Sequence, residues 1–315
     1  MQGFKIVRAD EPITERPLVI TVFGQPGIGK TSLSFTMPAP VLHLDFDRGF
    51  TRAVQSCRPD SAQIEDFGGF YGYMLSDAFA TYIKDTGIKS VVIDTAGAML
   101  DDFCAPYLIT VDRKNGNASG GLSLQGWGAL SILANNVKNR LQQLGVHVMF
   151  IAHSKDCGED AVCRMDLAVK GGTSDIITRV SDQIGFVYAE GKNRVLDFTP
   201  CQMHLGKDTA RIGKLPIPDA DSGQFDTFMT TVVDKCTDKM FALSQAQLNA
   251  KQRINSLKEQ LSNATTPEDF EEFSAEMKGD SDTIKLQLRT ALQEQMKKVG
   301  VSFKGKKFVA NEAAD

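Results

Sequence analysis

The sequence predicts an α/β fold, in which a mainly parallel β-sheet lies between layers of helices and a helical unit follows at the C-terminus. Short apolar runs rich in β-branched residues alternate with helical patterns, as expected of strands joined by crossover helices. After about Leu243 the composition changes to Gln, Glu, Lys and Ala without a strand signal. We therefore place a core domain at residues 1–242 and a helical unit with a basic tail at 243–315.

A glycine-rich turn between the first strand and a helix is the most informative part of the chain. Pro17 to Gly24 forms a buried-strand run, and the residues after it follow G-x-x-x-x-G-K-T, the phosphate-binding loop of nucleoside triphosphatases. Its members are Gly24, Gln25, Pro26, Gly27, Ile28, Gly29, Lys30, Thr31 and Ser32. Glycine lets the backbone wrap an anion, Lys30 supplies charge for the β- and γ-phosphates, and the Thr31 hydroxyl is a Mg²⁺ ligand. The motif predicts that the chain binds ATP or a close relative, with Mg²⁺.

The other core strands are predicted from apolar runs that end at turn residues. We place them at 40–45, 90–94, 146–152, 183–189, 194–199 and 202–206, the last three as a meander that finishes the sheet. A long amphipathic helix is predicted at 124–144. Two polar, glycine-containing segments, 113–121 and 154–174, follow candidate strands, where open α/β sheets place their functional loops.

Asp94 ends one of these strands and is the predicted second Mg²⁺ ligand. It lies 64 residues after Lys30, which leaves room in the chain for the strand at 41–45. This inserted strand argues against simple nucleotide kinases and small GTPases and favours the RecA, AAA+ and helicase branch. The next residue is Thr95, where many members of that branch have a Glu that activates water. The activating carboxylate is therefore expected elsewhere.

Asp45 and Asp47 are the candidates for this carboxylate, since they follow the strand after the phosphate-loop helix. Two carboxylates in an i, i+2 relation point to the same side of an extended segment. One of them is then placed to act as the general base while the other caps the turn, and we prefer Asp47 as the base. The alternative is that both only cap the turn into Arg48 and Gly49.

His153 ends the apolar strand that begins at Val146. This is where a γ-phosphate sensor is expected, although a structural role is the alternative. His147 and His204 lie within strand runs and are expected to be core or edge residues.

The C-terminal segment predicts helices and a basic tail. One helix is expected from Ser244 to about Asn263, and a second begins with Thr266 as N-cap and Pro267 in the first turn. Residues 279–282 break it, and a third helix runs to about Lys298. The tail carries Lys297, Lys298, Lys304, Lys306 and Lys307. We favour a helical unit attached to the core over a basic arm that recruits DNA or a partner.

Composition limits the class of protein. No apolar run reaches 18 residues and the first residues lack a signal-peptide core, so we expect no membrane and a cytoplasmic protein. The six scattered cysteines are expected to be free thiols. The net charge of −4 does not favour nucleic acid, so DNA would have to bind a local patch.

The motifs taken together resemble the short RecA-like ATPases of bacteriophages, the Sak-four-type single-strand annealing proteins and recombinases. The similar segments are GQPGIGKTS, LHLDFD, VVIDT, IAHSK and KDTARIGKLP, within about residues 15–220. The resemblance implies a RecA-like P-loop core with Asp47 as the catalytic carboxylate, although RecA itself usually has Glu there. It also implies that Lys207 and Arg211 act on the ATP of a neighbouring subunit, where the alternative is ordinary surface charge.

The same resemblance implies a phage protein in a bacterial host, with single-stranded DNA, other copies of the chain in a ring or filament, and a single-strand-binding protein as partners. The two polar segments match the DNA-binding loops of the family. Their basic residues are Arg113, Lys114, Lys155, Arg164 and Lys170. No N-terminal polymerisation helix of the RecA kind is evident, so filament geometry does not carry over.

We therefore expect an ATPase, stimulated by DNA, that promotes annealing or strand exchange. One alternative is a helicase-like or loader-type P-loop motor, which the absence of an Asp-Glu pair and of a further helicase domain disfavours. Another is a non-catalytic nucleotide-dependent scaffold, which Asp in place of Glu keeps open. The sequence leaves undecided the choice between ring and filament, the balance of annealing and invasion, the rate of hydrolysis and the role of the C-terminal helices.

Overall fold

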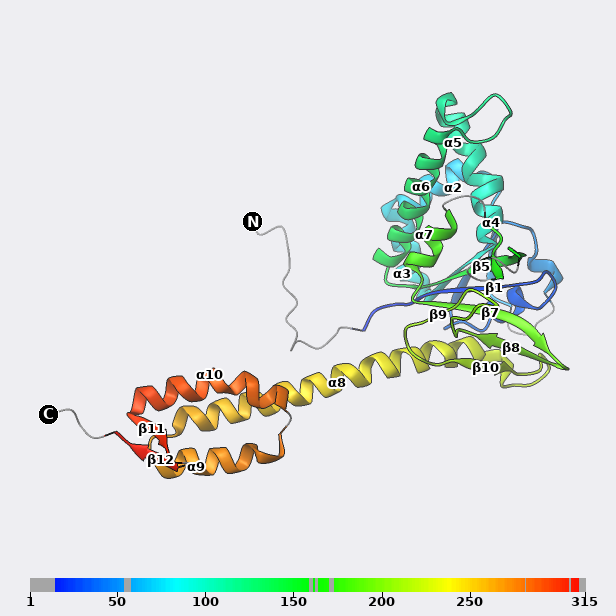
Figure 1. Ribbon diagram of the computed structural model, residues 1–315. Helices are drawn as coiled ribbons and strands as arrows, with labels where there is room; N and C mark the ends of the chain where they lie inside the picture. Colours follow the sequence, from blue (N-terminus) through cyan, green and yellow to red (C-terminus); the bar gives the residue numbers. More distant parts are fainter. Residues whose placement is uncertain are drawn as a thin grey trace. The chain divides into compact units, whose positions relative to one another are not determined.

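The computed structural model describes residues 15–53, 58–158, 161, 164–169, 173–280, 282–305 and 307–311. Residues 15–239 form one compact unit, and the chain from Met240 onward belongs to another. The first unit contains a mixed, mostly parallel sheet with helices on both faces (Figure 1). This is the predicted α/β class.

Strand β1 (Val19–Gly24) is central to the sheet, between β5 (His147–Asp156) and β7 (Gln183–Glu190). Beyond β5 follow β4 (Ser90–Asp94), β2 (Val41–Asp45) and the edge strand β3 (Asp60–Gln63), all parallel. In the sheet, β5 rather than β2 therefore separates the phosphate-loop strand from the strand of Asp94. The carboxyl ends of β1, β2, β4 and β5 meet at one edge.

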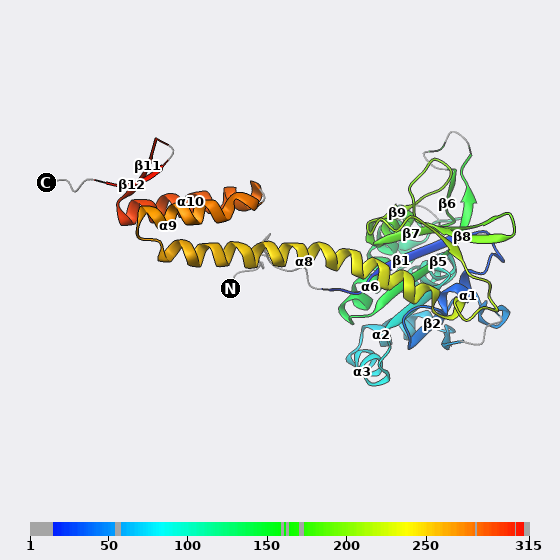
Figure 2. The same cartoon turned by 90° about the horizontal axis from the view of Figure 1, so that it is seen from below.

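The other side of the sheet is antiparallel. β8 (Asn193–Asp197) pairs with β7, and β10 (Lys214–Ile217) pairs with β8. Two short strands, β9 (Lys207–Asp208) and β6 (Met165–Leu167), pair with the start of β7 and the end of β5. Figure 2 shows this hairpin side next to β1.

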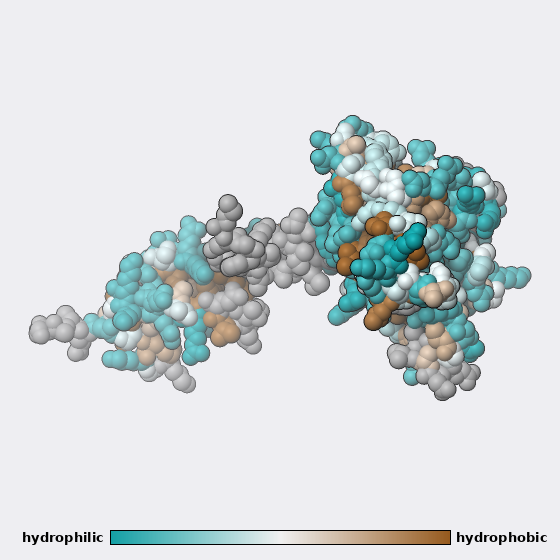
Figure 3. Space-filling view, turned by 90° about the horizontal axis from the view of Figure 1, so that it is seen from above, coloured by the Kyte–Doolittle hydropathy of each residue, from teal (hydrophilic) through white to brown (hydrophobic). Residues whose placement is uncertain are grey.

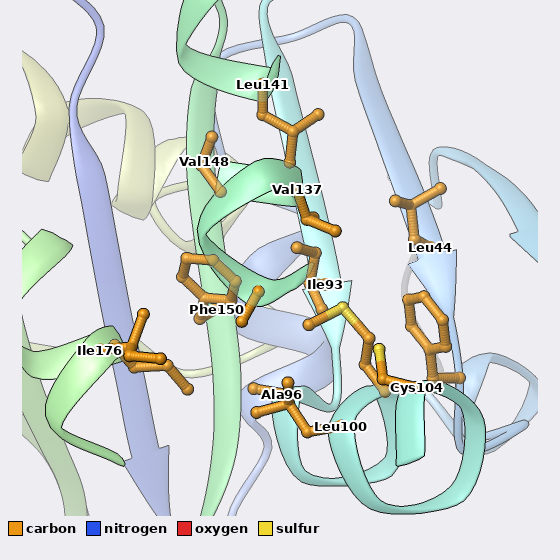
Figure 4. Packing of buried hydrophobic residues seen from close by; sticks show 14 of the residues in the cluster. Leu44, Ile93, Ala96, Leu100, Cys104, Val137, Leu141, Val148, Phe150 and Ile176 are labelled. Atoms are coloured by element: carbon orange, nitrogen blue, oxygen red, sulfur yellow. The ribbon is translucent and has the colours of Figure 1, made fainter. Parts of the chain in front are cut away.

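Alternation along the strands divides the core into two layers. Val19 and Phe23 join a cluster beneath the helices of one face. In that layer Val137 and Leu141 of α6 lie over Val148 of β5 (Figure 4). The helices contributing to it are α2 (Phe67–Leu75), α3 (Asp77–Thr86), α4 (Ala96–Ala98), the π-helix η2 (Met99–Cys104), α5 (Ala105–Val111), α6 (Leu124–Gln143) and α7 (Thr173–Val180).

The opposite layer contains the short helix α1 (Lys30–Ser34) and the start of α8 (Phe228–Asn263). Thr36, just after α1, accepts a hydrogen bond from the backbone of Met229 at 3.0 Å. Short 3₁₀ turns complete the unit at η1 (Phe50–Arg52), η3 (Arg113–Asn115) and η4 (Phe225–Thr227).

The C-terminal unit is a small helical bundle with a hairpin. It comprises the end of α8, α9 (Pro267–Glu276), η5 (Met277–Gly279), α10 (Asp282–Val299) and the strands β11 (Val301–Lys304) and β12 (Lys307–Ala310). Thr266 caps α9, as the sequence predicts, and it also forms a capping box with Asp269. Leu257, Phe270 and Phe273 are fully buried in its core.

Three predictions about elements are wrong. Residues 202–206 form no strand, and their only ladder contact is an isolated bridge between His204 and Met165. The helix predicted from Ser244 is the continuation of α8, which begins at Phe228. The segment 113–121 follows α5 rather than a strand and lies at the end of a helical projection (Figure 1).

The surface of both units is mostly hydrophilic on the face in Figure 3. Among the described residues, none of the helices combines the length and the apolar character needed to cross a membrane. Cys104, Cys157, Cys201 and Cys236 are free thiols. Cys57, Cys163, Lys170 and Lys306 lie outside the described residues.

Candidate nucleotide-binding site

The loop between β1 and α1 has the backbone that its glycines predict. Gly27 and Gly29 have φ of 78° and 97°, in the left-handed region that favours glycine. Gly24 is required for a different reason, because a Cβ there would lie 2.5 Å from the carbonyl oxygen of Val187 on β7. The loop is therefore held close against its neighbouring strand.

Lys30 is buried at the base of this loop. Its Nζ donates hydrogen bonds to the carbonyl oxygens of Gly24 at 3.0 Å and Gln25 at 2.9 Å. Burial lowers the pKa of Lys30 to about 8, although Asp94 and Asp47 act in the opposite direction. The ammonium is thus positively charged at neutral pH in a place that anionic oxygens would stabilise.

Asp94 is the centre of a buried hydrogen-bond network. Its Oδ2 accepts a 2.7 Å hydrogen bond from Thr31 Oγ1 and lies 3.2 Å from His43 Nε2. His43 is fully buried, and its Nδ1 lies 3.1 Å from Ser61 Oγ. Donation from Nε2 to the carboxylate leaves Nδ1 to accept from Ser61. Helix α1 and the strands β2 and β3 thus fix the orientation of the carboxylate.

The structure separates the two aspartates after β2. Asp45 is buried and accepts hydrogen bonds from the backbone of Gly49 at 2.9 Å and Phe50 at 3.2 Å, so it caps the turn. Asp47 lines the pocket, and its buried Oδ1 has no hydrogen-bond partner in the described part of the chain. Burial, followed by the charges of Asp94 and Asp45, raises the pKa of Asp47. A carboxylate with a raised pKa is a stronger base.

His153 reaches the same pocket from the end of β5. It is half-buried, and its Nδ1 is a buried atom without a hydrogen-bond partner among the described residues. Burial lowers the pKa of His153, and the nearby Lys30 ammonium lowers it further. The side chain is therefore a neutral imidazole near pH 7, able to donate or accept one hydrogen bond.

These residues surround one pocket of about 380 Å³. The phosphate loop contributes Pro26, Gly27, Gly29, Lys30, Thr31 and Ser32, and the other strands contribute Asp47, Asp94 and His153. Thus the sequence-predicted ligands and the two candidate catalytic side chains come together. Their chemical roles stay predictions.

Lys207 and Arg211 do not line this pocket. Lys207 Nζ instead donates to the carbonyls of Thr178 at 3.2 Å and Arg179 at 3.4 Å, near the C-terminal end of α7. Arg211 is exposed and has a left-handed backbone with φ of 55°. A role at the ATP of a neighbouring subunit stays a prediction for both residues.

Three residues near the site were not predicted from the sequence. Arg52 lines the pocket from η1. Arg194 of β8 donates to the carbonyl of Ile28 in the phosphate loop at 3.3 Å. His43 supports Asp94, and a polar side chain within the apolar run 41–45 was the available signal for it. Arg52 and Arg194 gave no such signal, because only the folded chain brings Arg52 to the pocket and Arg194 to the phosphate loop.

The donor set fits a magnesium nucleotide. Thr31 and Asp94 provide one hydroxyl and one carboxylate, which suits an ion that binds few protein oxygens and keeps phosphates and water as its other ligands. The glycine-lined loop leaves room for phosphates, and Asp47 lines the same pocket as Lys30.

Comparison with known proteins gives a family match and a structural similarity. A protein-family model described as an AAA domain matches residues 16–210. Among solved structures, the KaiC-like protein PH0186 from the hyperthermophilic archaeon Pyrococcus horikoshii OT3 is 11% identical, with a TM-score of 0.34 over 58% of this chain and 78% of that chain. None of the curated proteins compared matches the chain.

The family match covers more than half of the chain and includes the whole pocket. The sheet of this chain has one strand between the phosphate-loop strand and the strand of Asp94, and together with the family match this confirms the predicted RecA-like P-loop fold. The chain belongs to the AAA_24 family of AAA-domain P-loop ATPases.

Proposed function

We propose that this protein hydrolyses ATP, binds single-stranded DNA and promotes annealing or strand exchange in phage recombination. ATP hydrolysis is supported by one observation, that a single pocket is lined by the candidate binding and catalytic residues. These are Lys30, Thr31, Asp94, Asp47 and His153. Binding residues and a candidate base lie there within reach of the same ligand, as phosphoryl transfer requires.

In the proposed reaction Lys30 and the loop amides hold the phosphates, and Asp47 accepts the proton of the attacking water. The raised pKa of Asp47 suits this role, since the base must take up a proton in the transition state. His153 Nδ1 is assigned to the γ-phosphate or the water, because it is buried and unpartnered beside Lys30. When bound, Mg²⁺ supplies further charge neutralisation for the phosphate oxygens.

The DNA part rests on the resemblance of the motifs and on the basic residues of the two polar segments. Arg113 and Lys114 are exposed between α5 and α6, and Lys155 is exposed at the end of β5. Lys155 lies two residues after His153, which gives DNA at this point a direct connection to the nucleotide pocket. Such contacts predict binding without sequence preference that weakens with salt.

The test is ATP turnover of the full-length protein with and without single-stranded DNA, followed by an annealing assay with complementary oligonucleotides. We expect several-fold stimulation by DNA and faster annealing in the presence of ATP. An ATP turnover rate that is the same with and without DNA would contradict the proposal. Duplex unwinding would instead favour a helicase-like or loader-type P-loop motor. The Lys30→Ala variant is the control for contaminating ATPases.

A further inference from the structure

We propose that a second pocket beside the nucleotide site holds a base of single-stranded DNA and reports its presence to the ATPase. The inference rests on the proposed function and names a contact site for its DNA. The pocket has a volume of about 530 Å³. Its walls come from the phosphate loop, the end of β5, β6, β7 and the segment after β8, through Gln25, Ser154, Met165, Phe186, Tyr188 and Met203.

The walls of this base pocket suit a flat aromatic ligand. Phe186 and Tyr188 lie together on β7, with ring centroids 5.5 Å apart and planes 21° apart. Phe186 is buried and Lys214 Nζ lies 5.5 Å from the Tyr188 centroid, so a base would stack on Tyr188 in place of that ammonium. Met203 contributes a thioether and is 61% exposed. Aromatic rings that accept any base by stacking are typical of sites that bind single strands without sequence preference.

The polar edge of the base pocket offers hydrogen bonds and charge. Ser154 Oγ is a buried atom with no hydrogen-bond partner in the described ranges, so a base edge would satisfy it. Arg164 Nε lies 3.1 Å from Asp156 Oδ2, which balances the charge of that carboxylate at the rim. Lys155, between Ser154 and Asp156, is exposed but does not line the base pocket, because successive side chains of a strand point to opposite faces.

The base pocket and the nucleotide pocket share two backbone segments. Gln25 lines the base pocket and Pro26 the nucleotide pocket, while Ser154 lines the base pocket and His153 the nucleotide pocket. Gly24 and His153 are register partners in the parallel pair of β1 and β5. A ligand that moves Ser154 or Gln25 therefore moves a neighbouring residue at the phosphates. This arrangement predicts that a base here changes turnover.

The experiment uses the full-length protein with an oligothymidylate that carries 4-thiothymidine, and maps photo-crosslinks by mass spectrometry. We expect crosslinks at Tyr188, Met203 or Met165. In Tyr188→Ala we expect DNA binding, followed by fluorescence anisotropy, to weaken about tenfold, which is within the usual effect of losing one stacked base. In this variant the DNA-stimulated rate of ATP turnover should fall together with the DNA affinity, while the rate of ATP turnover without DNA stays at the wild-type value.

Tyr188→Phe should behave as wild type, because it keeps the ring. Tyr73→Ala removes a ring that is 44% exposed on α2, away from the base pocket, and is the matched control. Met203→Ala removes an exposed side chain, so it tests the pocket if thermal melting shows that Tyr188→Ala is unfolded.

Three outcomes would overturn the inference. Wild-type DNA affinity in both Tyr188→Ala and Met203→Ala, with crosslinks elsewhere, excludes the base pocket but leaves the proposed function intact. Loss of self-association with unchanged DNA affinity would assign the pocket to a contact between copies of the chain. A wild-type protein that binds no single-stranded DNA would overturn the proposed function as well.

Discussion

Asp94 Oδ2 accepts from a hydroxyl on the phosphate-loop helix and lies beside an imidazole on β2. The hydroxyl and the carboxylate are the predicted Mg²⁺ ligands, whereas the imidazole only orients the carboxylate. Residues that orient a metal ligand contribute to metal affinity without touching the metal. His43 is therefore a positioning residue, and its effect should differ from that of a ligand.

We expect His43→Leu to weaken Mg²⁺ binding by roughly 10- to 100-fold, because Asp94 loses a hydrogen bond that fixes its orientation. His43→Gln should recover part of the affinity, since its amide can donate to the same oxygen. The measurement is a Mg²⁺ titration of fluorescent-nucleotide binding. Nucleotide affinity without Mg²⁺ should stay constant, and a parallel loss there would mean that His43 only supports the fold.

Asp47→Asn should lower ATP turnover by roughly 100-fold or more while ATP affinity stays near normal, because a general base acts only in the chemical step. Asp45→Asn is the matched control. Its carboxylate accepts two backbone hydrogen bonds, so we expect a loss of stability of about 1–3 kcal/mol. Steady-state kinetics and urea unfolding of both variants separate the roles. Full turnover in Asp47→Asn would move the base to another group.

The pKa of Lys30 predicts a pH dependence of nucleotide binding. Burial lowers this pKa to about 8, so the ammonium is charged below pH 8 and loses its proton as the pH rises through that value. Bound phosphates favour the charged form. The affinity for ATP should therefore fall by about tenfold per pH unit above pH 8.

Equilibrium binding at several pH values from 7 to 9.5 tests this dependence. Lys30→Arg should bind more weakly but with a flat profile, since a guanidinium does not titrate in this range. A flat profile in the wild type would show that Lys30 keeps its proton throughout.

At the level of elements, the close approach of the phosphate loop to β7 is a packing constraint. Gly24→Ala would place a Cβ 2.5 Å from the Val187 carbonyl oxygen and force β1 and β7 apart. We expect a loss of stability of about 1–3 kcal/mol together with weaker ATP binding. Gly72→Ala, in α2 with open space around the new Cβ, should instead stabilise by about 0.5–1 kcal/mol. Thermal unfolding compares the two, and equal effects would refute the constraint.

Elements with a strong local signal were predictable. The apolar strands β1, β2, β4, β5 and β7 and the helix α6 were found within a few residues, because burial on both faces leaves a continuous apolar run. The edge strand β3, with the sequence DSAQ, has no such run because only one neighbour covers it. Residues 202–206 look like a strand locally, but Gly206 packs against the backbone of Thr199 instead of pairing in a ladder.

The residues of the site likewise differ in whether the sequence could predict them. The phosphate loop and Asp94 have fixed spacing and were predictable, and Asp47 was chosen over Asp45 from position alone. The positions of the other site residues depend on long-range contacts. The hydrogen bond of Arg194 to the phosphate loop joins residues 166 positions apart, and no local pattern encodes it. The helix start at Phe228 was missed because its apolar residues pack on the sheet and were counted as core.

At the level of the whole molecule, the trans role of Arg211 can be tested directly. Asp208 accepts from the backbone of Ile212 at 2.9 Å and Gly213 at 2.7 Å, so the turn that presents Arg211 is fixed. Lys207 is already engaged with the end of α7, which makes Arg211 the better candidate. If it completes a neighbour's site, mixed subunits of Lys30→Ala and Arg211→Ala should recover part of the activity that each lacks alone.

The mixture is titrated at fixed total protein and fixed single-stranded DNA, and co-assembly is verified by mass. Partial recovery follows because some interfaces pair an intact phosphate loop with an intact arginine. An arginine that served its own subunit would give no recovery at any ratio, since every Arg211→Ala subunit would then carry its own defect.

The position of β1 within the sheet has one more consequence. All six of its residues are buried between parallel neighbours, whereas β2, which leads to Asp47, has only the half-exposed β3 between it and the sheet edge. Opening of a sheet begins at its less protected elements. In mild denaturant the amide hydrogens of β2 should therefore exchange before those of β1 do. Such opening would displace Asp47 and His43 together, so the partly opened protein would lose turnover and bind Mg²⁺ more weakly while the phosphate-loop strand stays folded.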